Sequence, residues 1–359
     1  MITLNRNALI LLDGFLNFEY KHKVNVINLY QNVGEIFENP TPAINYLDST
    51  DCGLTSSALI TAIKNNYIIS LIEEYNKNDV KVITIYDSEY PKRLKDLPFN
   101  PLCLYAKGNL ALLNAKNTLS IVGSRKTLSE YAKMTMNLAS SFAKSGVVIV
   151  TGVASGGDAC AINGAIDSGN LICVLASGFN YIDLEINRDL INSVITKGLI
   201  ISEYPPEVAP RNFRYPIRNR IIAGLGDGTL IVSGNQISGT RHTASYSLEY
   251  GKDVFCFPYS PNYEGGKLCN ALIKDGAILT TCEQDIIEVL RFESIVNNKI
   301  ELTTNEELVF NAIKDGVTKV DDLCCQLNIK IFVLMPIISS LEIKGVITKG
   351  TASEYLPIK

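Results

Sequence analysis

The 359-residue chain has few of the side chains on which catalysis and metal binding usually depend. It contains two histidines, and its nine cysteines are scattered without a Cys-x-x-Cys pair. Because structural zinc sites need closely spaced Cys and His ligands, a zinc or redox centre has little support. The thiols fit a reduced, cytoplasmic protein in which most of them occupy core positions. We expect no metal and no cofactor.

Long apolar runs are also absent. No stretch of about 18 apolar residues occurs, and residues 1–13 lack the charged start and small-residue cleavage site of a secretory signal. The sequence therefore predicts a soluble, cytoplasmic protein with no membrane partner. The formal net charge is −4, so any nucleic-acid binding has to come from a local basic patch.

Two signatures of nucleotide binding are missing. The glycine turn that begins at Gly123 reads Gly-Ser-Arg-Lys-Thr-Leu, without Gly-x-Gly-x-x-Gly, and no Walker loop occurs. The segment before Gly152 ends in Thr151, without the acidic residue that would hold a ribose. A dinucleotide cofactor is therefore not expected.

From Thr118 to about Leu290, short segments rich in β-branched residues alternate with helical segments, and glycines mark the junctions. This spacing predicts β-α-β units and an extended Rossmann-like, mainly parallel sheet over residues 79–292. Predicted strands cover residues 80–85, 102–106, 119–122, 147–151, 171–176, 199–202, 229–233, 254–257 and 278–281. Predicted helices cover residues 128–145, 158–168, 187–197, 219–225, 241–251 and 268–275.

Two smaller domains are expected on either side of this sheet. Residues 1–78 are poor in glycine and carry apolar residues at helical spacing, which predicts an all-helical domain. Residues 301–359 predict three helices, at 305–313, 320–327 and 331–343, and a two-stranded wing, the pattern of a winged-helix domain. This last segment has six lysines and no arginine against eight acids, so a protein-contact or regulatory role is favoured over duplex binding.

Three glycine-containing loops should meet at one edge of the sheet, each before a helix. Helix N-termini expose unpaired N–H groups and carry a partial positive charge, so they favour anions. Several shallow phosphate sites suit a polyanion better than a single pyrophosphate. The candidate residues in these loops are Gly123, Ser124, Arg125, Lys126, Gly152, Ser155, Gly156, Ser238, Gly239, Thr240, Arg241 and Thr243.

The segment from Pro205 to Arg220 holds four of the chain's ten arginines against the single acid Glu207. Aromatic residues lie between the arginines, and the prolines are expected to keep the loop extended. Guanidinium groups beside aromatic faces are typical of single-strand nucleic-acid surfaces, where each stacked base contributes about 1–3 kcal/mol. The candidate residues here are Arg211, Phe213, Arg214, Arg218, Asn219 and Arg220.

An alternative interpretation fits the same composition. Arg218 and Arg220 would form structural ion pairs, for instance with Glu203, and Phe213 would pack in the core.

Six short blocks occur in one order along the chain: Gly123-Ser-Arg, Thr151-Gly-Val-Ala, Ser202-Glu-Tyr-Pro-Pro, Phe213 with Pro216 to Leu225, Ser238-Gly-Thr with Thr243-Ala, and Cys269-Asn-Ala-Leu-Ile with Gly276-Ala. The series resembles the DNA-processing protein A family, DprA or Smf, over about residues 80–290. The resemblance implies a homodimeric Rossmann-like protein that binds and protects single-stranded DNA and loads the RecA recombinase onto it in natural transformation. The family is not known for catalysis.

The resemblance also bears on the flanking domains and is incomplete in places. It implies a SAM-like or helix-hairpin-helix-like domain for residues 1–78, although a Gly-x-Gly hairpin is missing there, and a winged helix at the C-terminus. Where the family usually has a basic residue before Gly-Ile-Asp, this chain has Ser155-Gly-Gly-Asp158. One phosphate contact is therefore missing, and Lys126 or Arg241 would have to offset it.

A second hypothesis is an enzyme. Asp158 and Glu203 could act as acid and base in a nucleoside-monophosphate phosphoribohydrolase, since related Rossmann-like enzymes use a Gly-Gly-x-Gly-Thr loop and Ser238-Gly-Thr is the nearest equivalent here. Against it, Asp158 is as easily a helix cap over the Gly152 loop. The DNA-binding hypothesis instead predicts one continuous groove that joins Arg125 to the arginines of residues 211–220.

Overall fold

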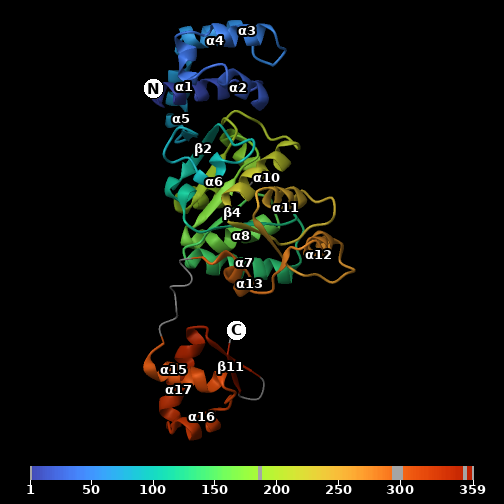
Figure 1. Ribbon diagram of the computed structural model, residues 1–359. Helices are drawn as coiled ribbons and strands as arrows, with labels where there is room; N and C mark the ends of the chain where they lie inside the picture. Colours follow the sequence, from blue (N-terminus) through green and yellow to red (C-terminus); the bar gives the residue numbers. More distant parts are fainter. Residues whose placement is uncertain (1, 185–187, 293–301, 351–353, 358–359) are drawn as a thin grey trace. The chain divides into compact units, whose positions relative to one another are not determined.

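The computed structural model describes residues 2–184, 188–292, 302–350 and 354–357 (Figure 1). The chain divides into two compact units, Met1–Ile295 and Val296–Lys359, and each is described by itself.

A nine-stranded sheet forms the centre of the first unit, in the order β1-β2-β6-β5-β4-β3-β7-β8-β9. The strands from β3 to β9 pair in parallel, whereas β2 pairs antiparallel with β6 and with β1. Their bounds are β1 Lys81–Thr84, β2 Cys103–Gly108, β3 Thr118–Val122, β4 Val148–Thr151, β5 Leu171–Val174, β6 Leu199–Ser202, β7 Gly228–Ile231, β8 Asp253–Cys256 and β9 Ile278–Leu279. Each predicted strand is present within two residues of its expected ends, and the Rossmann-like α/β fold is confirmed.

Helices cover the sheet, as the alternating pattern predicts. Strands β3 to β7 consist of buried residues throughout, which explains why their sequences are continuous apolar and β-branched runs. The helices of this region are α6 Lys92–Lys95, α7 Ser129–Lys144, α8 Gly157–Ala165, α9 Arg188–Lys197, α10 Arg214–Leu225, α11 Thr240–Glu249, α12 Lys267–Lys274 and α13 Glu283–Leu290. Short 3-10 helices are η2 Leu110–Asn114, η3 Ile166–Ser168, η4 Phe179–Leu184 and η5 Glu264–Gly266.

The strand order reverses once, at β3. The chain passes from β3 through β4 and β5 to β6 on one side, and then returns to β7 on the other side and continues to β8 and β9. In open α/β sheets, ligands bind outside the carboxyl ends of the strands at such a switch point. A ligand site is therefore expected at the loops after β3 and β7.

The N-terminal helices share their core with the sheet. The helices are α1 Ile2–Asp13, α2 Tyr20–Ile27, η1 Val33–Phe37, α3 Thr41–Asp48, α4 Ser56–Lys64 and α5 Tyr67–Lys77, and α1 and α5 lie beside β2 in Figure 1. The ring of Tyr75 meets that of Tyr105 edge-on with centroids 5.5 Å apart, and the Tyr105 hydroxyl donates to Asp13 Oδ2 at 2.8 Å. The boundary expected after residue 78 thus marks a change of secondary structure rather than a gap between two cores.

Helix α10 begins five residues earlier than the sequence suggested, at Arg214 instead of Asn219. The expectation that prolines keep this segment extended is wrong for residues 214–218. Pro216 falls in the first turn of the helix, where its missing N–H has no intrahelical partner to lose.

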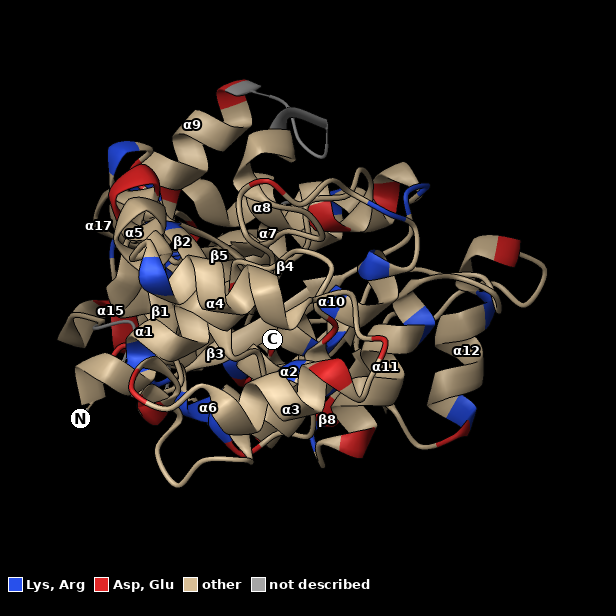
Figure 2. Ribbon diagram, turned by 90° about the horizontal axis from the view of Figure 1, so that it is seen from above, with Lys and Arg blue, Asp and Glu red and all other residues tan. Residues whose placement is uncertain are grey.

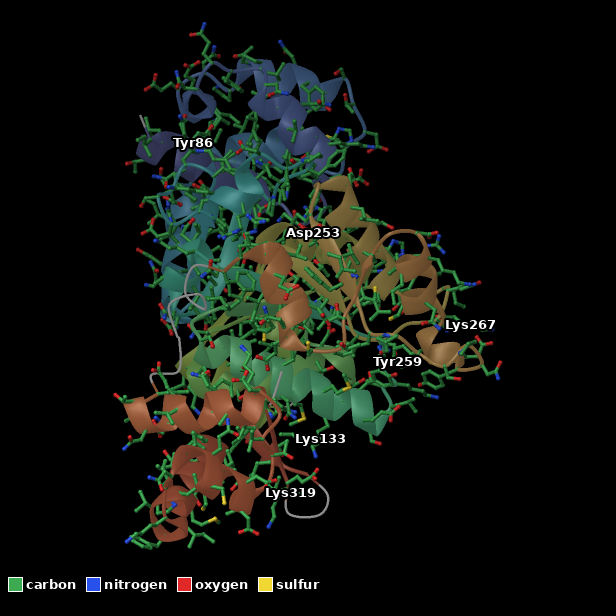
Figure 3. All side chains as sticks on the ribbon, turned by 60° about the horizontal axis from the view of Figure 1, so that its bottom comes forward. Tyr86, Lys133, Asp253, Tyr259, Lys267 and Lys319 are labelled. Carbon is green, nitrogen blue, oxygen red and sulfur yellow. The ribbon has the colours of Figure 1, made fainter. Side chains whose placement is uncertain are left out.

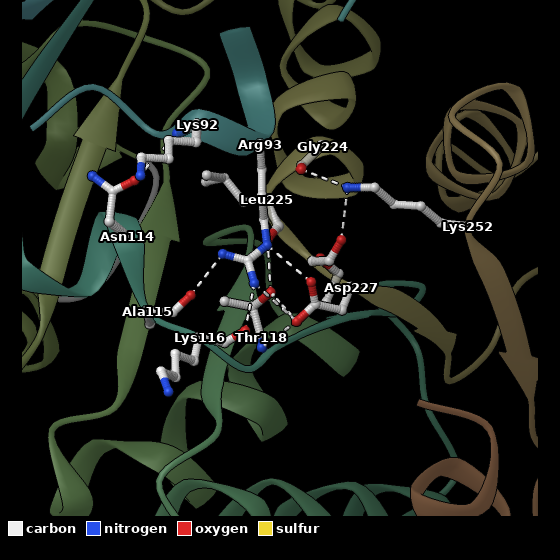
Figure 4. A network of polar contacts seen from close by, with 12 residues as sticks. Lys92, Arg93, Asn114, Ala115, Lys116, Thr118, Gly224, Leu225, Asp227 and Lys252 are labelled. Atoms are coloured by element: carbon white, nitrogen blue, oxygen red, sulfur yellow. Dashed lines mark hydrogen bonds and ion pairs between the residues drawn. The ribbon is translucent and has the colours of Figure 1, made fainter. Parts of the chain in front are cut away.

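The C-terminal end of α10 is fixed by a partly buried polar network (Figure 4). Lys252 Nζ donates to the carbonyl oxygens of Ala223, Gly224 and Gly226 at 3.0, 2.6 and 2.7 Å. These are the carbonyls that a helix end leaves without partners, and a cation is favourable beside them. Next to it, Asp227 accepts from Arg93 Nε at 2.9 Å and from the Thr118 amide at 2.8 Å.

The second unit contains α15 Thr304–Lys314, α16 Val320–Leu327, α17 Ile331–Ile343 and the antiparallel strands β10 Ile347–Lys349 and β11 Tyr355–Pro357. Its own small core includes Val309, Leu323 and Leu334. Glu306 accepts hydrogen bonds from Lys344, Ser340 and the Thr303 amide, and these bonds lower the pKa of its carboxyl to about 2. The elements follow the predicted order, and the winged-helix domain stays a prediction.

Among the described residues, no single helix has the length and hydrophobicity needed to cross a bilayer. Helices α16 and α17 reach that length and composition only as a pair, and the chain bends by 114° between them.

The network at the end of α10 leads to a first prediction. Asp227→Asn removes the charge that faces Arg93, so we expect the free energy of unfolding in urea to fall by about 1–3 kcal/mol. The matched control is Asp167→Asn, which removes an exposed partner of Lys197 and should change that free energy by less than about 0.5 kcal/mol. Equal losses in the two variants would show that the network does not fix α10.

Candidate nucleic-acid interface: two cavities beside α10

A cavity of about 760 Å³ lies at the switch point of the sheet. It is lined by loops that follow β3, β4, β7 and β8 and by one face of α10, and we name it the switch-point cavity. Ten of the predicted site residues line it: Gly123, Ser124, Arg125, Lys126, Arg218, Asn219, Ser238, Gly239, Thr240 and Thr243.

A second cavity, of about 640 Å³, borders another face of α10, and we name it the aromatic cavity. Its lining includes Phe213, Arg214 and Arg220 together with residues of the N-terminal helices and of α11. The remaining predicted residues line neither cavity: Gly152, Ser155, Gly156, Arg211 and Arg241. The single continuous groove expected from the sequence is therefore replaced by two cavities.

Arg218 and Arg220 are engaged inside the protein. Arg218 is 4% exposed and donates to the Val174 carbonyl and to Asn219 Oδ1. Arg220 is 8% exposed and forms an ion pair with Glu203. This is the structural role that the sequence left open as an alternative for Arg220, and it follows because a buried guanidinium needs an acceptor. Their predicted role as DNA contacts stays a prediction, and both side chains are buried.

Arg125 and Lys126 are the exposed cations of the switch-point cavity. They stand at the tip of the loop that follows β3. Neither makes an ion pair with any residue that the structure describes. Their charges are thus available to an anion.

The loop after β3 is held by close backbone contacts. The Ser124 amide donates to the Ser233 carbonyl at 3.0 Å, and the Ser124 carbonyl accepts from the Gly157 amide at 3.1 Å. A side chain at Gly157 would place its Cβ 2.4 Å from the Cα of Gly123. The loop and the start of α8 can therefore approach this closely only because both contact residues are glycines. These contacts set Arg125 at a fixed place on the sheet edge.

The start of α8 already holds an anion, the carboxylate of Asp158. Asp158 accepts from the amides of Gly123 and Ala154, both at 3.3 Å, and the residue is 5% exposed. The predicted phosphate contact at these amides is therefore taken by a side chain of the protein itself. Burial raises the pKa of Asp158 to about 6, although the nearby Arg218 guanidinium opposes that shift.

The start of α11 remains open to the cavity. Gly239 is exposed there, and a Cβ added to it would meet no atom within 4 Å. Asn219 Nδ2 donates to the Gly239 carbonyl at 3.2 Å and so ties α10 to this turn. Thr243 is 1% exposed, and its hydroxyl has no partner among the described residues. A buried hydroxyl without a partner on the cavity wall is suited to a ligand oxygen.

The two acids of the enzyme hypothesis lie apart. Asp158 lines the switch-point cavity, whereas Glu203 lines the aromatic cavity and is paired with Arg220. A general acid and base have to reach the same substrate, and these two line different cavities. In the described part of the chain, no group of three or more His, Cys, Asp or Glu side chains could hold a metal ion.

Sequence reasoning missed Tyr263 at the rim of the switch-point cavity. Its ring stacks on that of Tyr259, with centroids 5.5 Å apart, and Tyr259 in turn stacks on Tyr131 at 3.9 Å. Tyr259 is labelled in Figure 3. The aromatic spacing in the loop after β8 was a signal that could have drawn attention to this stack.

The protein as a whole is neither strongly basic nor strongly acidic. Basic and acidic residues are interspersed along the ribbon in Figure 2, in agreement with the net charge of −4. The cationic character is local, as the sequence required.

The strand order and the cavity at its reversal define a Rossmann-like α/β protein with a cavity at the switch point. The sequence model of one family, DNA recombination-mediator protein A, matches residues 81–291. The chain belongs to this family.

Curated relatives agree with that assignment. The chain is 35% identical over 243 residues to DNA processing protein DprA of Bacillus subtilis, a match over 66% of this chain and 81% of the relative. It is 34% identical to DprA of Streptococcus pneumoniae, over 58% of this chain and 74% of the relative. It is 36% identical to protein Smf of Escherichia coli, over 57% of this chain but only 56% of that protein.

Two solved structures resemble the fold. The crystal structure of DprA from Streptococcus pneumoniae superposes with a TM-score of 0.60 at 26% identity, over 76% of this chain and 98% of that one. A structure of DNA processing protein A from Helicobacter pylori, which concerns its single-stranded DNA binding mode, gives a TM-score of 0.54 at 28% identity, over 59% of this chain and 95% of that one.

The buried Asp158 leads to a second prediction. Its pKa is raised to about 6 from 3.8, so its contribution to stability is fully present below pH 4 and is lost as the pH rises through 6. We expect the free energy of unfolding of the wild type, relative to Asp158→Asn, to fall by about 1–3 kcal/mol between pH 4 and pH 7. Urea titrations of both proteins across this range measure the difference, and a constant difference would contradict the burial effect.

Proposed function

We propose that the protein binds single-stranded DNA at the switch-point cavity. The observation that carries the proposal is that the cavity joins the two exposed, unpaired cations Arg125 and Lys126 to the open start of α11. Cations and helix N-termini are the two features that attract phosphate groups. The Helicobacter pylori relative, whose single-stranded DNA binding mode has been studied, supports the same ligand for this chain.

In this proposal the residues have distinct roles. Arg125 and Lys126 contact phosphates, and Ser238, Gly239, Thr240 and Thr243 donate hydrogen bonds from the start of α11. Phe213, 59% exposed at the beginning of α10, is a platform on which a base can stack. The outlying residues Ser155, Gly156, Arg211 and Arg241 contact the strand beyond the cavity, whereas Gly152 is buried against Asp158 and Arg218 and makes no such contact.

The wider role rests on family membership. We propose that the protein works in the cytoplasm as a homodimer, that it protects incoming single strands, and that it loads RecA onto them in natural transformation and homologous recombination. It acts by binding and not as an enzyme. Residues 301–359, which are acidic overall, contact another protein or regulate binding.

A third prediction tests the cationic contacts. Arg125→Ala should weaken binding to single strands of unrelated sequence alike, because a phosphate contact carries no sequence information. The slope of log affinity against log salt should become shallower by about 0.7, the value for one phosphate contact on a single strand. Fluorescence anisotropy with labelled oligonucleotides from 50 to 300 mM salt gives both quantities.

The control for this prediction is Lys133→Ala. Lys133 is an exposed cation of α7, labelled in Figure 3, and it lines neither cavity. Its removal should leave the salt slope unchanged. If Arg125→Ala and Lys133→Ala gave the same slope as the wild type, the switch-point cavity would not be the phosphate site.

A fourth prediction separates binding from catalysis. Incubation with each nucleoside monophosphate should release no free base, because Asp158 and Glu203 line different cavities. Chromatography of the reaction mixtures detects the base directly. Base release that disappears in Asp158→Asn would establish the phosphoribohydrolase instead.

A further inference from the structure

The aromatic cavity is lined by many aromatic side chains, and the proposed phosphate contacts give these side chains no role. Its rings come from segments far apart in the sequence, namely the start of α2 and the residues before it, the loop before β2, the segment between β6 and α10, and the end of α11. They are Phe18, Tyr20, Phe99, Tyr204, Phe213, Tyr246 and Tyr250. A cavity of about 640 Å³ with several aromatic walls has room for a flat heteroaromatic ring.

Phe99 is held at the edge of this cavity in an unusual way. Its φ is +55°, a left-handed conformation that costs a non-glycine residue about 1–2 kcal/mol. The side chain gains little burial in return, since it is 70% exposed and meets the ring of Tyr20 only edge-on at 6.2 Å. Strained backbone conformations cluster at ligand-binding sites, so the strain at Phe99 is consistent with a ring that serves a ligand.

Arg220 provides an independent observation. Its Nη2 is bonded to Glu203, while its Nη1 is buried and has no partner among the described residues. Arg220 lines the aromatic cavity, so an acceptor atom on a ligand there can satisfy this donor.

The charges of the cavity disfavour a phosphate. Four acids line it against three cations, and one of those cations, Lys23, is already bonded to Asp13 at 2.7 Å. The cavity is better suited to a ligand that is uncharged, flat and equipped with hydrogen-bond acceptors. A nucleobase has all three properties.

The position of α10 connects this cavity to the phosphate site. Residues 215, 218 and 219 line the switch-point cavity, and residues 214, 217 and 220 line the aromatic cavity. At 3.6 residues per turn the mean directions of these two sets are about 150° apart, so they form two nearly opposite faces of one helix. A strand whose phosphates lie on the first face can turn a base over α10 onto the second.

We infer that the aromatic cavity is a second subsite, which receives an unstacked base of the bound single strand between Phe99 and Tyr246 and offers Arg220 Nη1 to an acceptor on the base edge. This inference rests on the proposed function, because the strand is brought to α10 by the switch-point cavity.

The test compares two oligonucleotides of equal length, oligo-dT and an abasic strand with the same number of phosphates. The wild type should bind oligo-dT more tightly. In Phe99→Ala and in Tyr246→Ala, affinity for oligo-dT should fall roughly five- to a hundredfold, the effect of one stacked base, while affinity for the abasic strand and its salt slope stay unchanged. Phe99→Trp should retain binding to oligo-dT.

Two controls keep the result interpretable. Phe332→Ala removes a 69% exposed ring from the second unit and should change neither affinity. Phe99→Gly relieves the left-handed strain, so this variant should fold at least as stably as the wild type and still lose affinity for oligo-dT.

The possible results distinguish a failure of the base subsite from a failure of the proposed single-stranded DNA binding. A wild type that binds neither strand overturns both. A wild type that binds both strands equally, or Phe99 variants that lose no affinity for oligo-dT, overturn the base subsite alone. If free thymidine changed the tyrosine fluorescence in a Phe99-dependent way while strand affinity did not depend on Phe99, the cavity would be a small-molecule site and the inference would be wrong.

Discussion

The arrangement of both cavities depends on how firmly α10 is fixed to the sheet. Lys252 holds the carbonyls at its C-terminal end, Arg218 reaches the Val174 carbonyl at the end of β5, and Arg220 is paired with Glu203 after β6. Buried charges with partners are costly to disturb, because the loss of one partner leaves the other unpaired in a medium of low dielectric. The arginines of this segment therefore position a helix, and the helix presents one face to each cavity.

The reversal of strand order at β3 decides where an anion can bind. It opens the sheet edge between the loops after β3 and β7, and the glycine contact between residues 123 and 157 brings a helix start against that edge. Of the two helix starts at the opening, α8 is neutralised by Asp158 and α11 is not. The unpaired cations Arg125 and Lys126 stand beside the open one, so phosphate recognition is expected from α11 and the β3 loop together.

Much of the fold could be predicted from the sequence, because strands buried on both faces have to be apolar and β-branched and because glycines mark the ends of the β-α-β units. The start of α10 could not, since Pro216 signals a loop unless it falls in a first helical turn. The partners of Arg218 and Arg220 were also out of reach, because a charge count does not show which carbonyl or carboxylate the fold brings near. The aromatic cavity escaped notice for a related reason: Tyr20, Phe99 and Tyr246 are distant in the sequence and meet only in the folded chain.

We propose above that the switch-point cavity is the main site that holds the phosphates of a single strand. Amide shift mapping of the ¹⁵N-labelled full-length protein with an abasic oligonucleotide tests it most directly, because that ligand offers phosphates without bases. We expect shifts at Arg125, Gly239 and Thr243 that saturate together and weaken with salt. Shifts confined to residues 302–350, or to residues that line the aromatic cavity alone, would contradict it.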